Sequence, residues 1–270
     1  MGDITLGQMY PGNSVLHRLD ARFKMFFTVM FVVMLFISSS PIALAVNVIF
    51  VAASYMLAKI PFKMLFKTLK PVIPIVLFML IFNIIFYSGE TVLLKFWIFK
   101  ITKEGLLTAV FMVFRITLIV LGTALLTYTT SSIELTDAIE SLLSPLKKVK
   151  FPVHELAMMM TIALRFIPTL IEETEKIMSA QKARGADFES GNLIKRVKAL
   201  LPILIPLFAS AIKRAGELAT AMESRCYYNG IGRTRLKTLK SGKNDYVAAA
   251  IMTAIFAVVV TLSFTADKFI

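Results

Sequence analysis

Cysteine and histidine are scarce in this sequence, and their scarcity excludes several classes of function. The chain of 270 residues has a single cysteine, Cys226, which rules out an internal disulfide, and its only histidines are His17 and His154. A metal site of the zinc type needs a cluster of such ligands, and none can be assembled from these residues. His154-Glu155 begins like a zinc-protease motif, but the second histidine of that motif is missing. We therefore expect no metal, no cofactor and no catalytic residue in this chain.

A phosphate-binding loop of the form Gly-x-x-x-x-Gly-Lys-Ser/Thr is also missing. Gly242-Lys243 comes nearest to it, but Asn244 follows this pair, and Lys237 stands where the first glycine belongs. If the protein works with ATP, another chain must therefore bind the nucleotide.

Charged residues make up only 17% of the chain, whereas apolar residues make up 57% and the mean hydropathy is +0.75. This balance predicts an all-α integral membrane protein. The net charge of +13 is unevenly spread, because residues 131–243 hold 18 Lys and Arg against 11 Asp and Glu, a net charge of +7. Such a block indicates the cytoplasmic side of a lipid membrane. No nucleic-acid-binding motif accompanies it, so we expect no nucleic-acid partner.

Five apolar segments predict membrane-spanning helices, at residues 22–37, 42–58, 72–87, 105–128 and 246–264. The third is short for a bilayer whose apolar core is about 30 Å thick. Residues 91–104 mix aromatic residues with lysines, which indicates a segment lying in the outer interface. Arg115 interrupts the fourth span. Because no acidic residue in the other spans can pair with it, we expect Arg115 to have a structural role in the bundle.

Two long basic helices are predicted between the fourth and fifth spans, at residues 153–184 and 193–225, after a short amphipathic helix at 133–143. Pro168 in the first long helix, and Pro202 and Pro206 in the second, are expected to bend them. Each helix carries apolar residues at the spacing of one helical stripe. These stripes include Met160, Leu164, Ile167, Leu204, Leu207, Phe208 and Ala211.

A transmembrane hairpin is the alternative for the two long helices. The apolar stretch at residues 199–212 has fourteen residues, fewer than the roughly twenty that a span needs. Basic residues flank this stretch on both sides, so both of its ends favour the same side of the membrane. We therefore favour helices that lie along the membrane surface or pack on other helices.

The two long helices end alike, in Ala183-Arg184-Gly185 and in Ser224-Arg225-Cys226. A single arginine at a helix C-terminus is mildly stabilising, and alone it would call for no other role. Its recurrence indicates more, because an arginine beyond a helix end can donate paired hydrogen bonds to a carboxylate of another protein. Two such ends suit a partner with two equivalent grooves, as a dimer has.

Five sequence blocks, taken in order, give the chain a specific resemblance over nearly its whole length. They are Tyr10-Pro11-Gly12 with Ser14 and His17-Arg18-Leu19-Asp20, Thr129-Thr130-Ser131-Ser132-Ile133-Glu134-Leu135-Thr136-Asp137, Ala163-Leu164-Arg165-Phe166-Ile167-Pro168, Ala180-Gln181-Lys182-Ala183-Arg184-Gly185-Ala186-Asp187, and Ala221-Met222-Glu223 with Arg225, Gly230, Arg233 and Thr234. With these blocks the chain resembles the transmembrane T-component of energy-coupling-factor transporters, a family related to the membrane component of cobalt and nickel importers.

The resemblance implies a partner pair of homologous cytoplasmic ABC ATPases and a small membrane S-component, either dedicated or one of several exchangeable ones, that binds a vitamin or micronutrient. It implies that Arg184 and Arg225 dock in grooves of the ATPases, together with the flanking Ala183, Gly185, Ser224 and Cys226. The apolar stripes would then face the S-component. Ser224 and Cys226 depart from the family pattern, in which alanine and glycine flank the second arginine.

The expected organisation is therefore an N-terminal membrane domain of four spans at 1–130, a cytoplasmic coupling domain at 131–243, and a C-terminal span at 244–270. The protein would be a multi-pass protein of the cell membrane, with the N-terminus and the coupling domain in the cytoplasm and the C-terminus outside. ATP would be hydrolysed by the partners and not by this chain. Two alternatives stay open: a membrane component of a cobalt or nickel importer, and an ATPase-independent carrier that uses Arg115.

Overall fold

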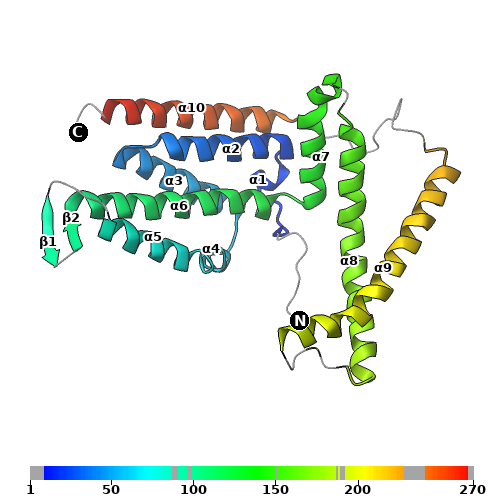
Figure 1. The fold of residues 1–270 in the computed structure, drawn as a ribbon. Helices are drawn as coiled ribbons and strands as arrows, with labels where there is room; N and C mark the ends of the chain where they lie inside the picture. The colour runs from blue at the N-terminus through cyan, green and yellow to red at the C-terminus, as the bar shows by residue number, and fades with distance from the viewer. Residues whose placement is uncertain are drawn as a thin grey trace. The chain divides into compact units, whose positions relative to one another are not determined.

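The computed structural model describes residues 9–86, 91–96, 99–149, 151–186, 188, 192–227 and 241–266, which are almost entirely helical (Figure 1). The predicted all-α membrane class is confirmed. The chain divides into two compact units, one formed by Met1–Ala138 with Leu239–Ile270 and the other by Ile139–Thr238. Of the sequence blocks, Asp187, Gly230, Arg233 and Thr234 lie outside the described residues.

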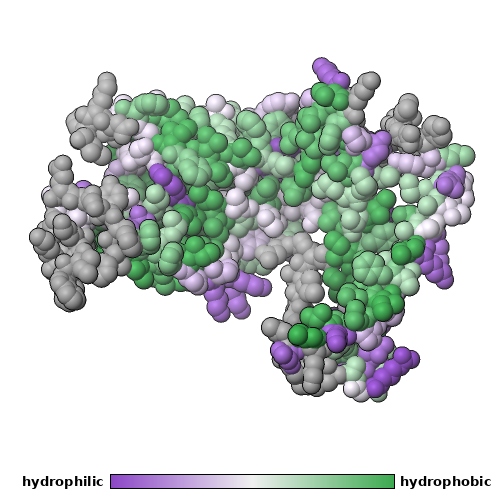
Figure 2. Space-filling model, in the orientation of Figure 1, coloured by the Kyte–Doolittle hydropathy of each residue, from purple (hydrophilic) through white to green (hydrophobic). Residues whose placement is uncertain are grey.

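The first unit is a bundle in which α2, α3, α6 and α10 lie side by side (Figure 1). Figure 2 shows hydrophobic side chains over most of its visible face, and Phe36, Ile49 and Phe78 are more than 60% exposed. Such a surface suits lipid rather than water. The helices are α1 (Val15–Arg18), α2 (Ala21–Ile37), α3 (Pro41–Ala58), α4 (Phe62–Leu69), α5 (Ile73–Phe86), α6 (Lys103–Thr129) and α10 (Lys243–Ala266), with α7 (Ser132–Leu143) at the boundary with the second unit.

Five helices of the described part are long and apolar enough to cross a membrane. Three of them, α3, α6 and α10, are spans that the sequence predicted. The predicted first span is α2, which has 17 residues. The remaining two are the long helices α8 and α9 of the second unit, so length and composition alone do not separate them from spans.

The predicted third span is one arm of a bent pair of helices. Helix α4 meets α5 at an angle of 58°, and Pro71 lies in the short break between them. Proline lacks the N–H that would continue the ladder of an α-helix and its ring clashes with the preceding turn, which accounts for a break at this point. Such a bent pair is either a broken span or a re-entrant loop, a feature that the apolar run at 72–87 does not reveal.

Residues 91–104, predicted to lie in the outer interface, have a backbone conformation that the sequence did not indicate. Where the sequence indicated an interfacial segment, the backbone forms an antiparallel hairpin of β1 (Val92–Phe96) and β2 (Phe99–Thr102). In this hairpin Phe96 pairs with Phe99. The hairpin precedes α6, whose first turn is capped by the hydroxyl of Thr102.

Close packing between α2 and α6 depends on Gly122. A Cβ at this position would lie 2.3 Å from the ring of Phe31, so any side chain here would force the two helices apart. Small residues at such crossings let helix backbones approach each other in membrane proteins. Phe31, Met34 and Leu35 of α2 are buried in the resulting core.

Arg115 contacts the end of α2 and takes the structural role that its sequence context predicts. Its Nη2 donates to the carbonyl oxygen of Ser38, the C-cap residue of α2, at 2.7 Å. The last carbonyls of a helix have no partner within the helix, and a cation near them also interacts favourably with the helix dipole. Arg115 therefore satisfies a polar group that would otherwise be left unpaired in the bundle.

The Tyr10–Asp20 block folds onto the bundle. The Tyr10 N–H donates to the carbonyl of Tyr128 at 2.9 Å, and His17 Nε2 lies 3.0 Å from the Tyr10 carbonyl, to which it donates. The other ring nitrogen of His17 then accepts from the hydroxyl of Ser14. A Cβ on Gly12 would lie 2.9 Å from the His17 ring, which explains the glycine.

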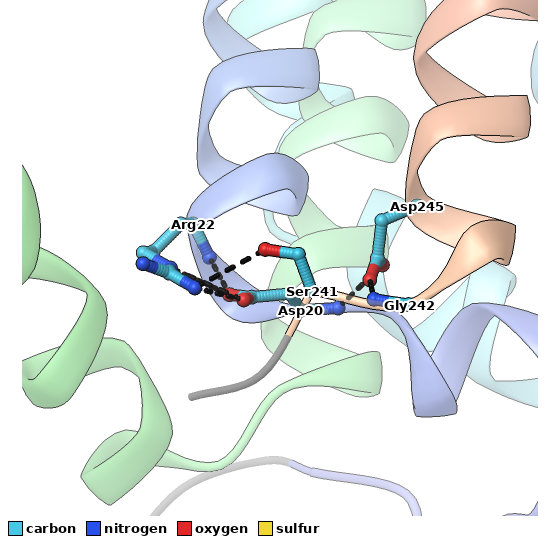
Figure 3. Close-up of polar contacts among 5 residues, drawn as sticks. All are labelled: Asp20, Arg22, Ser241, Gly242 and Asp245. Carbon is cyan, nitrogen blue, oxygen red and sulfur yellow. Dashed lines mark hydrogen bonds and ion pairs between the residues drawn. The ribbon is translucent and has the colours of Figure 1, made fainter. Parts of the chain in front are cut away.

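Asp20 and Asp245 tie the N-terminal ends of α2 and α10 together (Figure 3). Asp245 accepts from the backbone N–H of Asp20 at 2.8 Å and from that of Gly242 at 2.6 Å. Asp20 caps α2 by accepting from the Arg22 N–H and is also held by the Arg22 guanidinium, with Nη2 2.6 Å from Oδ2. The first and last predicted spans are thus joined by a hydrogen bond between residues 225 positions apart.

Because of this arrangement, we expect the stability of the bundle to fall at acidic pH. Burial raises the pKa of Asp20, but hydrogen bonds from Arg22 and its positive charge outweigh burial and hold the pKa below the ordinary 3.8. Because the folded-state pKa is the lower one, the stabilisation by Asp20 is complete above the ordinary pKa and is lost as the pH falls through the folded value.

We therefore expect acidification below about pH 4 to lower the unfolding temperature of the wild type more than that of Asp20→Asn, which keeps a helix cap without a titrating group. Thermal unfolding of both proteins in the same detergent, at a series of pH values, measures the difference. Parallel pH profiles for the two proteins would contradict the assignment.

The second unit contains the two long helices. After the 3-10 helix η1 (Ser144–Val149) come α8 (Val153–Ala183) and α9 (Leu193–Ser224). Pro168 lies inside α8, and Pro202 and Pro206 lie inside α9. Helix α9 crosses α8 and changes direction along its length (Figure 1), as expected from prolines that remove hydrogen bonds from the helix ladder.

Candidate functional site

The C-terminal end of α8 is closed by a Schellman motif with Arg184 as its cap residue. Gly185 adopts the left-handed conformation at φ 86°. Its N–H donates to the carbonyl of Lys182 and that of Ala186 donates to the carbonyl of Gln181, both at 3.0 Å. This pair of bonds satisfies the last carbonyls of the helix and stops it at the arginine.

The end of α9 repeats this geometry around Arg225. The N–H of Cys226 donates to Glu223 at 2.9 Å, and that of Tyr227 donates to Met222 at 3.0 Å. Cys226 takes the left-handed position, at φ 54°. The cysteine that replaces the expected glycine therefore does not remove the cap. The two helices end in the same backbone motif, with an arginine at the same position in each.

Replacement of Cys226 by glycine should stabilise this helix end. A side chain in the left-handed region costs about 1 kcal/mol, and glycine avoids that cost. We expect Cys226→Gly to slow amide hydrogen exchange in the last turn of α9 by roughly fivefold. Ser224→Gly is the matched control, since Ser224 lies in the helix and glycine there should speed exchange. Unchanged exchange in Cys226→Gly would show that the cap carries no strain.

Both arginines are available to a partner. Arg184 and Arg225 are exposed, as are the flanking residues Ala183, Gly185, Ser224 and Cys226. Among the described residues, no carboxylate lies within ion-pair distance of either guanidinium. An exposed guanidinium with its hydrogen-bond donors unused can form a bidentate pair with a carboxylate of another protein.

A polar contact ties the two helices together between their ends. The Ser210 hydroxyl donates to Glu173 of α8, and Arg214 Nη2 lies 3.1 Å from Glu173 Oε2. Arg214 is 40% exposed and Glu173 only 21%, so the pair is partly shielded from water. Sequence analysis did not identify this contact, because nothing in the spacing of single charges shows which helix faces they meet on.

The structure splits the predicted apolar stripe of α9 between two faces. One face carries the buried Ile203 and the half-buried Leu207 and Ala211, next to Ser210 and Arg214, which contact α8. The other face is exposed and apolar, and it includes the predicted residues Leu204 and Phe208, 43% and 65% exposed. Val197, Leu201, Ile205 and Ile212 lie on the same face.

On α8, the predicted stripe residues Met160, Leu164 and Ile167 are half-buried. Val153 and Ala157, at the start of the helix, are the buried ones. The exposed apolar face of the second unit therefore belongs mainly to α9. We call the six residues of that face, from Val197 to Ile212, the free face of α9.

The bundle of apolar helices and the crossed helices α8 and α9 define a multi-pass α-helical membrane protein. The profile of the CbiQ family, described as cobalt transport protein, matches residues 12–237. The chain belongs to this family.

Curated relatives cover nearly the full chain. A protein of Acidaminococcus fermentans is 50% identical over 261 residues, which are 96% of this chain and 97% of its own length. A protein of Clostridium kluyveri is 51% identical over 248 residues, 92% of each chain, and one of Bacillus subtilis is 46% identical over 253 residues, 93% and 96%. Each is named energy-coupling factor transporter transmembrane protein EcfT. The resemblance inferred from the sequence blocks is therefore confirmed.

Proposed function

We propose that this chain is the transmembrane component of an energy-coupling-factor importer. It transmits motion from a pair of cytoplasmic ABC ATPases to a small membrane S-component that binds a vitamin or micronutrient. The observation that carries the proposal is the matched pair of helix ends, where Arg184 and Arg225 occupy the same cap position and are both exposed.

Each arginine docks in a groove of one ATPase by pairing with a carboxylate. The Schellman motif fixes the direction in which the chain leaves the helix, so the guanidinium projects beyond a rigid end. Two docked helices of one chain hold two ATPase subunits at once, and the second contact forms at the high effective concentration that the first one creates.

The second unit passes the motion on. When ATP binds, the ATPase pair closes and draws the two arginines together. The contact of Glu173 with Ser210 and Arg214 makes α8 and α9 move together. The free face of α9 is the surface for the S-component, because a membrane protein can cover exposed Phe208 and its neighbours with apolar side chains of its own.

In the proposed orientation, the N-terminus and the second unit lie in the cytoplasm and the C-terminus lies outside the cell membrane. The basic balance of residues 131–243 supports this orientation. Although α8 and α9 are long enough to span, α8 carries Arg165 three residues from its midpoint, and Glu172, Glu173 and Glu175 follow in its second half. A charge at the centre of a membrane costs about 2.5–3.5 kcal/mol, so we place both helices at the membrane surface.

A second candidate is the membrane component of a cobalt or nickel importer, which the description of the matching family favours. It differs in its partners and not in the use of Arg184 and Arg225. An independent carrier built on Arg115 has less support, because that guanidinium is engaged by the Ser38 carbonyl.

Purification of the tagged chain from its own host in mild detergent, with mass spectrometry of the proteins that accompany it, tests the proposal. We expect two ATPases with phosphate-binding loops and at least one small, very hydrophobic membrane protein. Metal-binding membrane partners would favour the second candidate. Recovery of the folded chain alone, together with transport by the chain reconstituted without partners, would overturn both.

A further inference from the structure

A mainly apolar cavity of about 310 Å³ lies inside the first unit. It is lined by the N-terminal halves of α2 and α10 and the C-terminal halves of α3 and α6, together with residues of α1. Phe27, Phe50, Leu125 and Met252 supply much of the apolar wall. The volume is at the lower end of the range of about 300–1,000 Å³ for sites that bind small molecules.

The cavity opens on the outer surface of the bundle. Leu57 and Val247 line it and are 61% and 58% exposed, on α3 and α10. In a membrane-spanning bundle this surface faces the lipid, so the compounds with direct access to the opening are lipids. Each methylene that moves from water into an apolar pocket contributes about 0.8 kcal/mol, but this gain is small when the alternative is the bilayer. Something other than the apolar wall must therefore select an occupant.

Lys24 supplies the selective group. It lines the cavity and is only 5% exposed. Its ammonium donates to the carbonyls of His17 and Thr129, at 3.1 and 2.8 Å, which leaves one of its three N–H donors unused by these contacts. Among the described residues, no carboxylate lies within ion-pair distance of it. Three carboxylates act on the charge of Lys24 from beyond ion-pair distance, those of Glu134, Asp245 and Asp20. Asp20 is engaged by Arg22, and Asp245 by backbone N–H groups.

A buried cation without a paired anion is costly, and a ligand that brings an anion removes that cost. Lys24 lies in the first turn of α2, at the end of the bundle that we propose to be cytoplasmic. The lipid leaflet on that side is the anionic one. A phosphate attached to an acyl chain therefore matches both parts of the site, its cation and its apolar wall.

We propose that this cavity binds one acyl chain of an anionic phospholipid whose phosphate pairs with the ammonium of Lys24. The bound lipid contacts α2, α3, α6 and α10 together and so stabilises the bundle. The site is separate from the arginines and from the free face of α9, and it is tested independently of the proposed function.

The test uses the full-length chain, delipidated in neutral detergent and titrated with dioleoyl phosphatidylglycerol or dioleoyl phosphatidylcholine under native mass spectrometry. Both lipids carry a phosphate, but phosphatidylcholine also carries a choline cation that cancels its charge. We therefore expect one phosphatidylglycerol to bind, at least about fivefold more tightly than phosphatidylcholine, a difference of about 1 kcal/mol. Lys24→Met should abolish this preference. Equal affinity for the two lipids would overturn the proposal. So would binding of inorganic phosphate alone that stabilises the protein as much as phosphatidylglycerol does.

A second variant covers the case in which Lys24→Met fails to fold, because Lys24 also donates hydrogen bonds to two backbone carbonyls. Ala248→Phe fills the cavity from the half-buried Ala248 on α10 and leaves Lys24 in place. It should lower phosphatidylglycerol binding at least tenfold. Ala250→Phe, an exposed position on the same helix and outside the cavity lining, is the matched control and should bind as the wild type does. Undiminished binding by Ala248→Phe would place the lipid elsewhere.

Discussion

Charge reversal at both helix ends, Arg184→Glu with Arg225→Glu, should abolish ATP-coupled uptake and the recovery of ATPases with the tagged chain. Each guanidinium is expected to pair with a carboxylate, and an arginine at the centre of an interface contributes about 2 kcal/mol or more, roughly a 30-fold change in affinity. Reversal also adds repulsion against that carboxylate. We expect each single variant to weaken attachment at least tenfold and the double variant to lose it.

Lys213→Glu provides the matched control. Lys213 lies on α9 and its side chain is 79% exposed, but it is remote in sequence from the helix end. Its reversal changes the net charge by as much as either single variant does and should leave attachment and uptake close to those of the wild type. Uptake at the wild-type rate by the Arg184→Glu, Arg225→Glu double variant would refute docking through these ends.

Asp245→Ala should destabilise the membrane bundle more than any change at the helix ends. The substitution removes the acceptor of two backbone N–H groups, those of Asp20 and Gly242. Asp20 and Asp245 are both buried, whereas Gly242 is exposed and its N–H can bond to water instead. A buried N–H left without a partner costs about 1–3 kcal/mol, so we expect a loss of roughly that size in unfolding free energy.

Thermal unfolding of the purified protein in one detergent measures this effect, and limited proteolysis near residue 241 shows whether α10 has loosened. Asp245→Asn should be milder, because its amide keeps one carbonyl acceptor. Lys243→Ala, two residues away and exposed, should unfold as the wild type does. An unchanged unfolding temperature for Asp245→Ala would show that the link between α2 and α10 contributes nothing to stability.

Segment type was predictable wherever the local sequence decides it. The apolar runs gave α2, α3, α6 and α10 within a few residues, and the end of α8 at Arg184 followed from Gly185. The cap at Arg225 was harder, because cysteine rarely adopts the left-handed conformation that the structure shows for Cys226. The break at Pro71 and the β-hairpin were missed, because an apolar run indicates burial and not where the backbone changes direction.

The sequence by itself determined the membrane class, the long basic helices and the two arginines at their ends, since hydropathy, charge and helix-stop residues act locally along the chain. Only the tertiary structure decided which groups meet: Asp245 with the N–H of Asp20, Glu173 with Arg214, and Lys24 with a cavity formed by five helices. It also decided that Leu207 turns to the α8 side of α9 while Phe208 stays free. The reason is that a stripe of apolar residues fixes the period of a helix but not the direction of its neighbour.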